Sequence, residues 1–266
     1  MRLVLKLKAI KEKEFPYNYN AIVSKEISNL LGFETPEFKD YLKSKGFRAT
    51  DKPFGLFTFN LHFENVFHKK ETLFLRSNNA HLSISFPLIN DYIKSNVIDR
   101  LSDKELIIQK GQSQTTFLIT KVETIQDPLF RDDIIFVPKS PIILPGKKMI
   151  KNVLRNIYFS YRDDIRTVSK LIKEDLCRKY ESIYNSQVSN DFIFFQWDRN
   201  YIYANEKTSK KLKPKFMLEY NQKNYAVLGN VVPFRIKGNP ELIRVGYQCG
   251  FGKMNYLGFG FSEFQD

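Results

Sequence analysis

The amino-acid sequence predicts an α+β fold built from two tandem ferredoxin-like (RRM-like) units, each with the element order β-α-β-β-α-β. Segments with alternating apolar residues, typical of half-buried strands, are interleaved with segments whose apolar residues recur at helical spacing. The two kinds of segment follow a similar order in both halves of the 266-residue chain, although the halves share no direct sequence repeat. We therefore predict an N-terminal domain over residues 1–127 and a C-terminal domain over residues 128–266.

The first half supplies one set of these elements. Leu3, Leu5 and Leu7 alternate with more polar neighbours and predict a strand. Helical spacing follows from Tyr19 to Leu31, where Gly32 provides a natural stop. The remaining expected elements are a helix from Pro36 to Lys45 closed by Gly46, strands at 54–64 and 72–76 that pair as a hairpin, a helix from Pro87 to Arg100, and strands near 104–109 and 115–123.

The second half repeats the order after a connector at 128–133. One long helix from about Asp163 to Tyr184 is marked by apolar residues on a single face. The other expected elements are strands at 134–144, 191–198 and 213–237, a short helix near 240–249, and a last strand over 256–264.

The composition points to a polyanionic partner. Lys and Arg outnumber Asp and Glu by 42 to 29, which gives a net charge of +13. The chain also holds 24 Phe and 14 Tyr, and aromatic rings interleaved with lysines are typical of surfaces that bind single-stranded nucleic acid. The alternative is that most rings form the core and most lysines are solvated.

Several classes of site and protein are excluded by simple counts. Cys177 and Cys249 are too far apart in sequence for a CxxC site and too few for a disulfide framework. His62, His68 and His81 lack metal-ligand spacing, and His62 is interpreted as a satisfied structural histidine. We therefore expect no metal and no cofactor. Because the sequence has no long apolar run, we expect a soluble cytoplasmic protein without a membrane partner.

Two basic clusters are the first candidates for contact with nucleic acid. The stretch KKMIKNVLR (147–155) places Lys147, Lys148, Lys151 and Arg155 within reach of one helical face. The stretch KTSKKLKPK (207–215) puts five lysines in a predicted hairpin. Surface solvation explains one such cluster, whereas two clusters in a strongly basic chain favour nucleic acid.

A glycine-rich segment near the C-terminus is the third candidate. GYQCGFGKMNYLGFGF (246–261) holds five glycines in sixteen residues, although glycine is costly inside helices and strands. It matches neither a Walker A pattern nor GxGxxG after a strand. Two interpretations remain open: a nest of backbone N–H groups that binds phosphate, or a loop that packs flat between two sheets.

This segment also carries a family resemblance. ELIRVGYQCGFGKMNYLGFGF (241–261) resembles the C-terminal signature of the CRISPR-associated endoribonucleases of the RAMP superfamily, which cut repeat RNA. FPYNYNAIVSKEI (15–27), YLKSKGF (41–47), GLFTFNL (55–61) and FVPKSPIIL (136–144) extend the resemblance over nearly the whole chain. It implies a prokaryotic protein that binds CRISPR repeat RNA, the precursor crRNA. The RNA-binding residues of the segment would be Gly250, Gly252, Lys253, Gly258 and Gly260.

The resemblance further implies metal-independent cleavage, in which a ribose 2′-OH attacks the adjacent phosphorus and leaves a 2′,3′-cyclic phosphate. Many family members carry a tyrosine, a histidine and a lysine at positions occupied here by Ser28, Lys43 and Gly55. Lys52 is near enough in sequence to replace the last of these. Lys43 or Lys45 could stabilise the phosphorane or act as an acid. The alternative for both is a solvated helix end.

Three functions therefore stay open from the sequence. The protein is an active repeat endoribonuclease that uses lysines, a catalytically silent repeat-binding subunit, or a scaffold RAMP protein that coats guide RNA. The last two would have other subunits of a CRISPR effector complex as partners. A homodimer is compatible with all three.

Overall fold

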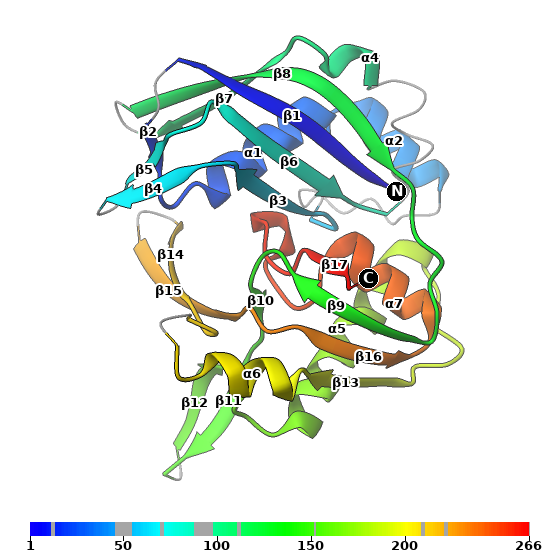
Figure 1. Cartoon of the computed structure of the whole chain (residues 1–266). Coiled ribbons are helices and arrows are strands. Elements are labelled where there is room, and N and C mark those ends of the chain that lie inside the picture. Colours follow the sequence, from blue (N-terminus) through cyan, green and yellow to red (C-terminus); the bar gives the residue numbers. More distant parts are fainter. Residues whose placement is uncertain are drawn as a thin grey trace.

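The computed structural model shows an antiparallel sheet in the N-terminal half of the chain (Figure 1). The structure describes residues 1–11, 14–45, 55–69, 72–87, 98–110, 113–151, 153–208, 211–220 and 223–265. The strands of this sheet are β1 (Arg2–Lys11), β3 (Thr58–Phe63), β6 (Asn79–Ser85), β7 (Glu105–Lys110) and β8 (Ser113–Ile125). They lie in the order β3-β6-β1-β8-β7.

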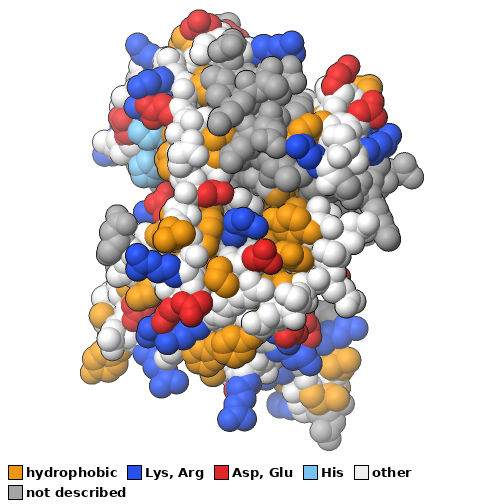
Figure 2. Space-filling model, turned by 90° about the vertical axis from the view of Figure 1, so that its right-hand side faces the viewer, with side chains coloured by type: hydrophobic (Ala, Val, Ile, Leu, Met, Phe, Trp, Pro, Cys, Tyr) orange, Lys and Arg blue, Asp and Glu red, His pale blue; other side chains and the backbone are white. Residues whose placement is uncertain are grey.

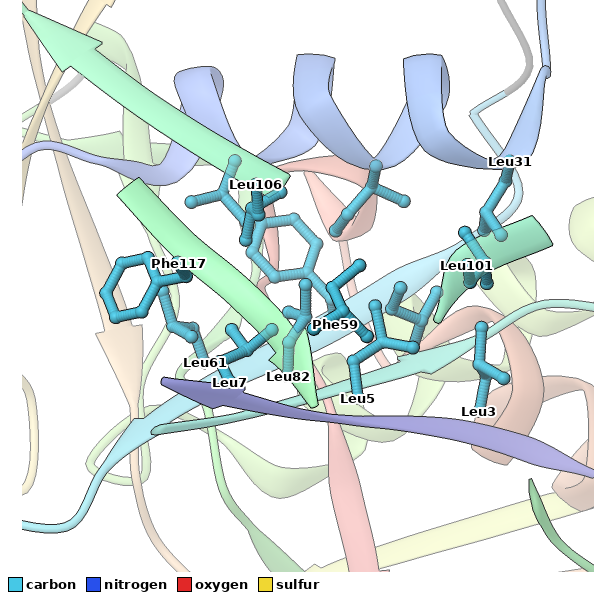
Figure 3. Close-up of a cluster of buried hydrophobic side chains, with 14 of the residues drawn as sticks. Leu3, Leu5, Leu7, Leu31, Phe59, Leu61, Leu82, Leu101, Leu106 and Phe117 are labelled. Carbon is cyan, nitrogen blue, oxygen red and sulfur yellow. The ribbon is translucent and has the colours of Figure 1, made fainter. Parts of the chain in front are cut away.

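Helices α1 (Asn20–Leu31) and α2 (Pro36–Ser44) belong to the same half, and α1 covers one face of this sheet. Leu3, Leu5 and Leu7 of β1 point toward α1 and are buried, which confirms the strand predicted from their alternation (Figure 3). Helix α1 ends at Gly32, whose φ of 66° is left-handed, as the glycine stop predicts. Thr35 caps α2 by accepting a hydrogen bond from the Phe38 backbone N–H at 3.3 Å.

The predicted hairpin between 54–64 and 72–76 is wrong. Strand β3 pairs with β6, because Ala80, Leu82 and Ile84 alternate toward the core and give β6 the stronger apolar face. The segment at 72–76 instead forms β5 (Thr72–Leu75), which lies between β2 (Glu14–Pro16) and β4 (Val66–Lys69) in a separate sheet. Of the helix expected from Pro87 to Arg100, the structure describes α4 (Ile98–Leu101), and residues 88–97 lie outside the described residues.

The C-terminal half contains a four-stranded antiparallel sheet with the order β13-β16-β9-β17. Helices α5 (Ile165–Tyr184) and α7 (Pro240–Cys249) pack against its core, which includes Phe136, Phe195, Phe234 and Phe251. The strands of this sheet are β9 (Asp133–Pro138), β13 (Ile193–Trp197), β16 (Phe234–Gly238) and β17 (Ser262–Phe264). The helices expected near 163–184 and 240–249 are thus confirmed.

Other expected strands of this half are divided. The strand expected at 134–144 forms β9 and β10, and the one expected at 213–237 forms β14, β15 and β16. Only 262–264 of the last expected strand is extended. The additional elements are β10 (Ile142–Ile143), β11 (Pro145–Ile150), β12 (Val153–Tyr158), α6 (Arg199–Asn205), β14 (Lys215–Tyr220), β15 (Lys223–Asn230) and the 3-10 helix η1 (Asn255–Leu257).

The prediction that 147–155 forms a helical face is also wrong. This stretch forms an antiparallel hairpin of β11 and β12, with Lys148 opposite Arg155. The chain turns at Lys151, whose φ of 48° is left-handed. Ile150 and Val153 flank that turn, and such β-branched residues favour strands.

The two halves meet along an interface built around Arg2. Its guanidinium donates to the backbone carbonyls of Tyr247 at 3.1 Å and Ser262 at 2.6 Å, and lies 3.6 Å from the Tyr247 ring centroid. Burial lowers the pKa of Arg2 to about 10. Because β1 thereby binds both α7 and β17, the start of the chain fixes the position of its last elements. Among the described helices, none is long and apolar enough to cross a membrane.

Candidate nucleic-acid interface

The glycine-rich segment begins in the last turn of α7 and lies between the two sheets. Gly250, Gly252, Gly258 and Gly260 are all buried and have φ values of 85°, 78°, 78° and 74°. A Cβ on Gly252 would lie 2.5 Å from the backbone oxygen of Ile143, and a Cβ on Gly260 would lie 2.1 Å from the backbone oxygen of Phe251. These positions need glycine because of both left-handed backbone and close packing within the chain.

Backbone hydrogen bonds attach this segment to the C-terminal half. The Lys253 N–H donates to the Ile143 carbonyl at 2.9 Å, and the Gly260 N–H donates to the Pro141 carbonyl at 2.9 Å. The buried Asn255 side chain donates to the carbonyls of Phe251 at 3.3 Å and Phe259 at 2.9 Å, so it closes the loop on itself. These N–H groups are directed at protein carbonyls.

The N-terminal half holds the other side of the segment. Asn20 of α1 donates to the Leu257 carbonyl at 2.6 Å, and Thr58 of β3 donates to the Phe259 carbonyl at 3.0 Å. Gly258 lies against the Phe59 ring, which would be 2.7 Å from an added Cβ. Of the two interpretations left open by the sequence, this geometry supports the packed loop. RNA contact by the glycines stays a prediction.

A buried lysine of α5 binds backbone carbonyls of the glycine-rich segment. The Lys179 ammonium donates to the carbonyls of Gly250 at 2.7 Å and Gly252 at 2.8 Å, and to Asp175 at 2.5 Å. Its three donors therefore have three acceptors, which makes the burial of this cation tolerable. Lys253, predicted to bind RNA, is 36% exposed and pairs with Asp175 at 2.9 Å.

Two of the residues predicted to carry catalysis, Ser28 and Lys43, lie on the helices α1 and α2, and Lys45 is the C-terminal cap of α2. Ser28 is half-buried in α1, and its hydroxyl donates to the Ser24 carbonyl at 3.1 Å. Lys43 is exposed in the last turn of α2 and pairs with Asp40 at 3.3 Å. The Lys45 ammonium lies 5.7 Å from the Tyr41 ring centroid. Lys52 lies outside the described residues.

The end of α2 lies near the base of the glycine-rich segment. Leu42 packs against a small buried cluster formed by Ile183 of α5 with Val245 and Cys249 of α7. Cys249 directly precedes Gly250, and burial raises the pKa of its thiol to about 12. The structure therefore brings the neighbourhood of Lys43 and the start of the segment to the same part of the molecule.

The basic cluster at 147–155 occupies the β11–β12 hairpin, which extends away from the N-terminal sheet in Figure 1. Lys147 and Lys148 are adjacent in a strand and therefore point to opposite faces. Lys148 pairs with Asp163 at 2.7 Å, whereas Arg155 is exposed opposite Lys148 and Lys151 lies at the turn.

The second basic cluster does not form the predicted five-lysine hairpin. Lys207 follows α6, and Lys215 begins β14. Lys213 donates to the Tyr158 carbonyl at 2.9 Å, and burial lowers the pKa of its ammonium group. Lys210 lies outside the described residues. On the face seen in Figure 2, Lys and Arg side chains are interspersed with acidic ones.

Sequence reasoning missed a hollow between β3 of the first half and β14 of the second. His62 is exposed on its wall, opposite His81 in the β3–β6 pair, and its interpretation as a satisfied structural histidine stays a prediction. Tyr17, Lys139 and Phe216 also line this hollow. The signal was present in the alternation of β3, which directs Leu61 to the core and His62 away from it. Within the described part of the chain, no three His, Cys, Asp or Glu residues are placed to hold a metal ion.

Comparison with known families and proteins gives a consistent result. Residues 123–264, more than half of the chain, match the family model for CRISPR associated protein Cas6, C-terminal. The CRISPR-associated endoribonuclease Cas6 1 of Methanocaldococcus jannaschii is 27% identical over 270 residues, which cover 98% of this chain and 91% of the relative. A putative CRISPR-associated endoribonuclease-like protein, Cas6nc of Pyrococcus horikoshii, is 24% identical and covers 98% of both chains.

Two solved structures share the fold. One, described as the product of a Cas6-related gene from Pyrococcus furiosus, has a TM-score of 0.74 at 19% identity and covers 100% of this chain and 98% of its own. The other, described as a RAMP protein binding different RNA substrates, has a TM-score of 0.71 at 19% identity and covers 100% of both chains. These likenesses establish a common mixed α+β architecture.

Proposed function

The chain belongs to the family of CRISPR associated protein Cas6, and from this premise we propose that it is an endoribonuclease that binds CRISPR repeat RNA and cleaves precursor crRNA. The observation that carries the proposal is the likeness to the Methanocaldococcus jannaschii endoribonuclease over 98% of this chain. The excess of 42 Lys and Arg over 29 Asp and Glu supports a polyanionic substrate.

The proposed reaction needs no metal because the nucleophile belongs to the substrate. The ribose 2′-OH attacks the adjacent phosphorus, the 5′-oxygen of the next nucleotide leaves with a proton, and a 2′,3′-cyclic phosphate remains. The protein has to supply a base near the 2′-OH, an acid near the leaving oxygen, and positive charge beside the phosphorane. RNA is required, since DNA lacks the attacking hydroxyl.

We assign the chemistry to the end of α2. Lys43 is the first candidate for stabilising the phosphorane, with Lys45, Lys52 and Ser28 as further candidates. The exposure of Lys43 and the packing of its neighbour Leu42 against the base of the glycine-rich segment support this assignment. The RNA-binding residues proposed are Lys147, Lys148, Lys151 and Arg155 of the β11–β12 hairpin, and Gly250, Gly252, Lys253, Gly258 and Gly260 of the segment.

The same proposal includes the finer description of the fold. We describe the chain as two tandem ferredoxin-like domains over residues 1–127 and 128–266. Support comes from the strand orders β3-β6-β1-β8 and β13-β16-β9-β17, in which the first strand of each half lies between the third and the last. Two separate hydrophobic clusters, one for each half, also support the division.

One gel tests the function. Labelled repeat RNA incubated with the protein in EDTA should be cut at one site. Replacing the single ribose at that site by its 2′-deoxy form should abolish cleavage and leave binding intact. Activity that requires Mg²⁺ and tolerates the deoxy sugar would contradict attack by the 2′-OH.

A second function is favoured by one observation. The side chains at two expected catalytic positions are engaged within their own helices: Ser28 donates to Ser24, and Lys43 pairs with Asp40. A protein with no working acid or base would be a silent repeat-binding subunit or a scaffold of a CRISPR effector complex. The same gel distinguishes this function from cleavage, because a silent subunit retards the labelled repeat RNA in the gel and never cuts it. The mass of the protein–RNA complex in solution then reports whether one or two copies bind.

A further inference from the structure

Asp175 of α5 is surrounded by three cations. Its side chain is 3% exposed, and its Oδ2 accepts from the buried Lys179 at 2.5 Å. The other carboxylate oxygen, Oδ1, accepts from Arg178 at 2.5 Å and from Lys253 at 2.9 Å. One negative charge therefore faces three positive charges within hydrogen-bond distance.

The surplus positive charge lies on the solvent side of this cluster. Lys179 uses all three of its donors inside the protein, so its charge and that of Asp175 offset each other. The remaining two cations share a single oxygen, which brings them close together although they repel. The Arg178 side chain is 58% exposed and that of Lys253 is 36% exposed, so an anion can approach both.

Both cations are held in place by the fold. Arg178 lies on α5, about one helical turn after the buried Asp175. Lys253 is fixed through its backbone, which donates to Ile143 and lies next to Gly252, whose carbonyl binds Lys179. A pair of positioned donors, one a planar guanidinium and the other an ammonium, matches the oxygens of a phosphate.

We propose that Arg178 and Lys253 form a phosphate-binding site for one phosphodiester of the RNA backbone, with Asp175 and Lys179 as its positioning residues. The proposal rests on the proposed function, because it names a place where the RNA is held. It also gives the glycine-rich segment a role besides packing: its left-handed turns carry Lys253 to the open side of α5.

The test removes both cations and uses two probes. Binding of single-stranded repeat RNA is measured between 50 and 200 mM salt, and melting is followed with inorganic tripolyphosphate. For Arg178→Ala/Lys253→Ala, the log–log salt slope should fall by about 1.4, because each cation that neutralises phosphate on a single strand contributes about 0.7 to the slope. The rise in melting temperature caused by tripolyphosphate should fall by at least half.

Two matched variants control for indirect effects. Lys170→Ala removes an exposed α5 cation, paired with Glu174 at 3.8 Å, and should leave slope and melting shift unchanged. Arg178→Lys/Lys253→Arg exchanges the two cations and should keep most of the slope. If the alanine pair and the wild type show equal salt slopes and equal melting shifts, the site is wrong and the proposed function stands.

The remaining outcomes separate the two proposals. If the wild type does not bind repeat RNA but tripolyphosphate protects it through Arg178 and Lys253, the anion site stands and the proposed function fails. If tripolyphosphate depends on the pair and the RNA slope does not, the assignment to an RNA phosphodiester is overturned. Absence of both effects in the wild type overturns the site as well.

Discussion

The glycine-rich segment and the β11–β12 hairpin are both predicted from sequence to bind RNA, yet the segment is mostly buried and the hairpin is mostly exposed. The segment is buried between the halves, and its polar backbone groups bond to Pro141, Ile143 and Thr58. The hairpin is paired only within itself among the described strands and exposes Met149 and Leu154 at 62% and 57%.

This difference suggests that the segment positions neighbouring groups and that the hairpin attracts the RNA. A buried segment with fixed left-handed turns cannot adapt to a ligand, but it can position neighbouring groups. An exposed hairpin with four cations and no acidic residue between Pro145 and Tyr158 attracts a polyanion without fixing its geometry. Changes at the buried glycines of the segment should therefore affect folding, and changes at the neighbouring end of α2 should affect reaction rate, whereas changes in the hairpin should affect affinity.

The largest effect is expected at Gly252. Replacing it by Val forces a β-branched residue into φ 78° and places its Cβ against the Ile143 carbonyl, where backbone cannot give way cheaply. Left-handed strain of about 1–3 kcal/mol and overpacking of similar size predict a loss of about 3 kcal/mol or more. Thermal melting followed by circular dichroism should show a drop of about 6 °C or more.

The hairpin offers the matched control for this change. An added Cβ on Gly146 meets the buried ring of Phe159 at 2.7 Å, but Gly146 has no left-handed φ. Gly146→Ala should therefore lack the strain of the left-handed backbone and cost only the overpacking, about 1 kcal/mol or somewhat more. Equal melting of Gly252→Val and the wild type would show that the segment does not need its glycines for packing, and RNA contact would become their better explanation.

The second prediction concerns rate. Lys43→Ala should slow single-turnover cleavage at least about a hundredfold, since removing one group that stabilises a transition state electrostatically commonly costs about 3 kcal/mol. Repeat affinity should change less than about tenfold, because a group that acts on the phosphorane contributes little to ground-state binding. Quench-flow cleavage and equilibrium binding of the same RNA measure the two quantities.

Lys39→Ala is the control, because Lys39 is an exposed lysine of the same helix, paired with Glu34 at 3.8 Å. It should leave both quantities unchanged. If Lys43→Ala lowers rate and affinity together, Lys43 only touches phosphate. If Lys43→Ala and Lys45→Ala both cut at the wild-type rate, the end of α2 is not the active site.

Local patterns predicted those parts of the fold that depend on local signals. The Gly32 stop of α1 and the single apolar face of α5 are such signals. Strand pairing was not predicted correctly, because the choice of β6 over β5 as partner of β3 depends on the shared core. The helical face at 147–155 failed because lysines four residues apart fit a helix as well as a hairpin.

In the candidate site, too, local features were predicted from the sequence and long-range contacts were not. Spacing located the glycine-rich segment, but its packing depends on Phe59 and Ile143, which are distant in sequence. The spacing of Asp175 and Lys179 predicts an ion pair, since residues four apart on a helix are neighbours. Such pairs usually lie on the exposed surface of a helix, so the spacing does not predict burial. Nothing local distinguishes this buried pair, because the Gly250 and Gly252 carbonyls that bury it come from another element.

The smallest effect is expected in the hairpin, and it concerns affinity. Lys147→Ala/Lys151→Ala should lower the log–log salt slope of repeat binding by about 1.4, because each lysine that neutralises a phosphate of single-stranded RNA contributes about 0.7 to that slope. Adding Lys148→Ala should flatten it by less than about 0.7 further, because Asp163 already offsets part of the Lys148 charge at 2.7 Å.

The cleavage rate at saturating protein should stay unchanged in both hairpin variants, which separates them from Lys43→Ala. Lys39→Ala again serves as the control, since it removes one lysine charge from another part of the surface and should leave the slope unchanged. An unchanged slope in the triple variant would mean that the hairpin faces away from the RNA. Its exposed Met149 and Leu154 would then mark a surface for a protein, because aliphatic side chains without stacking rings suit a protein interface better than bases.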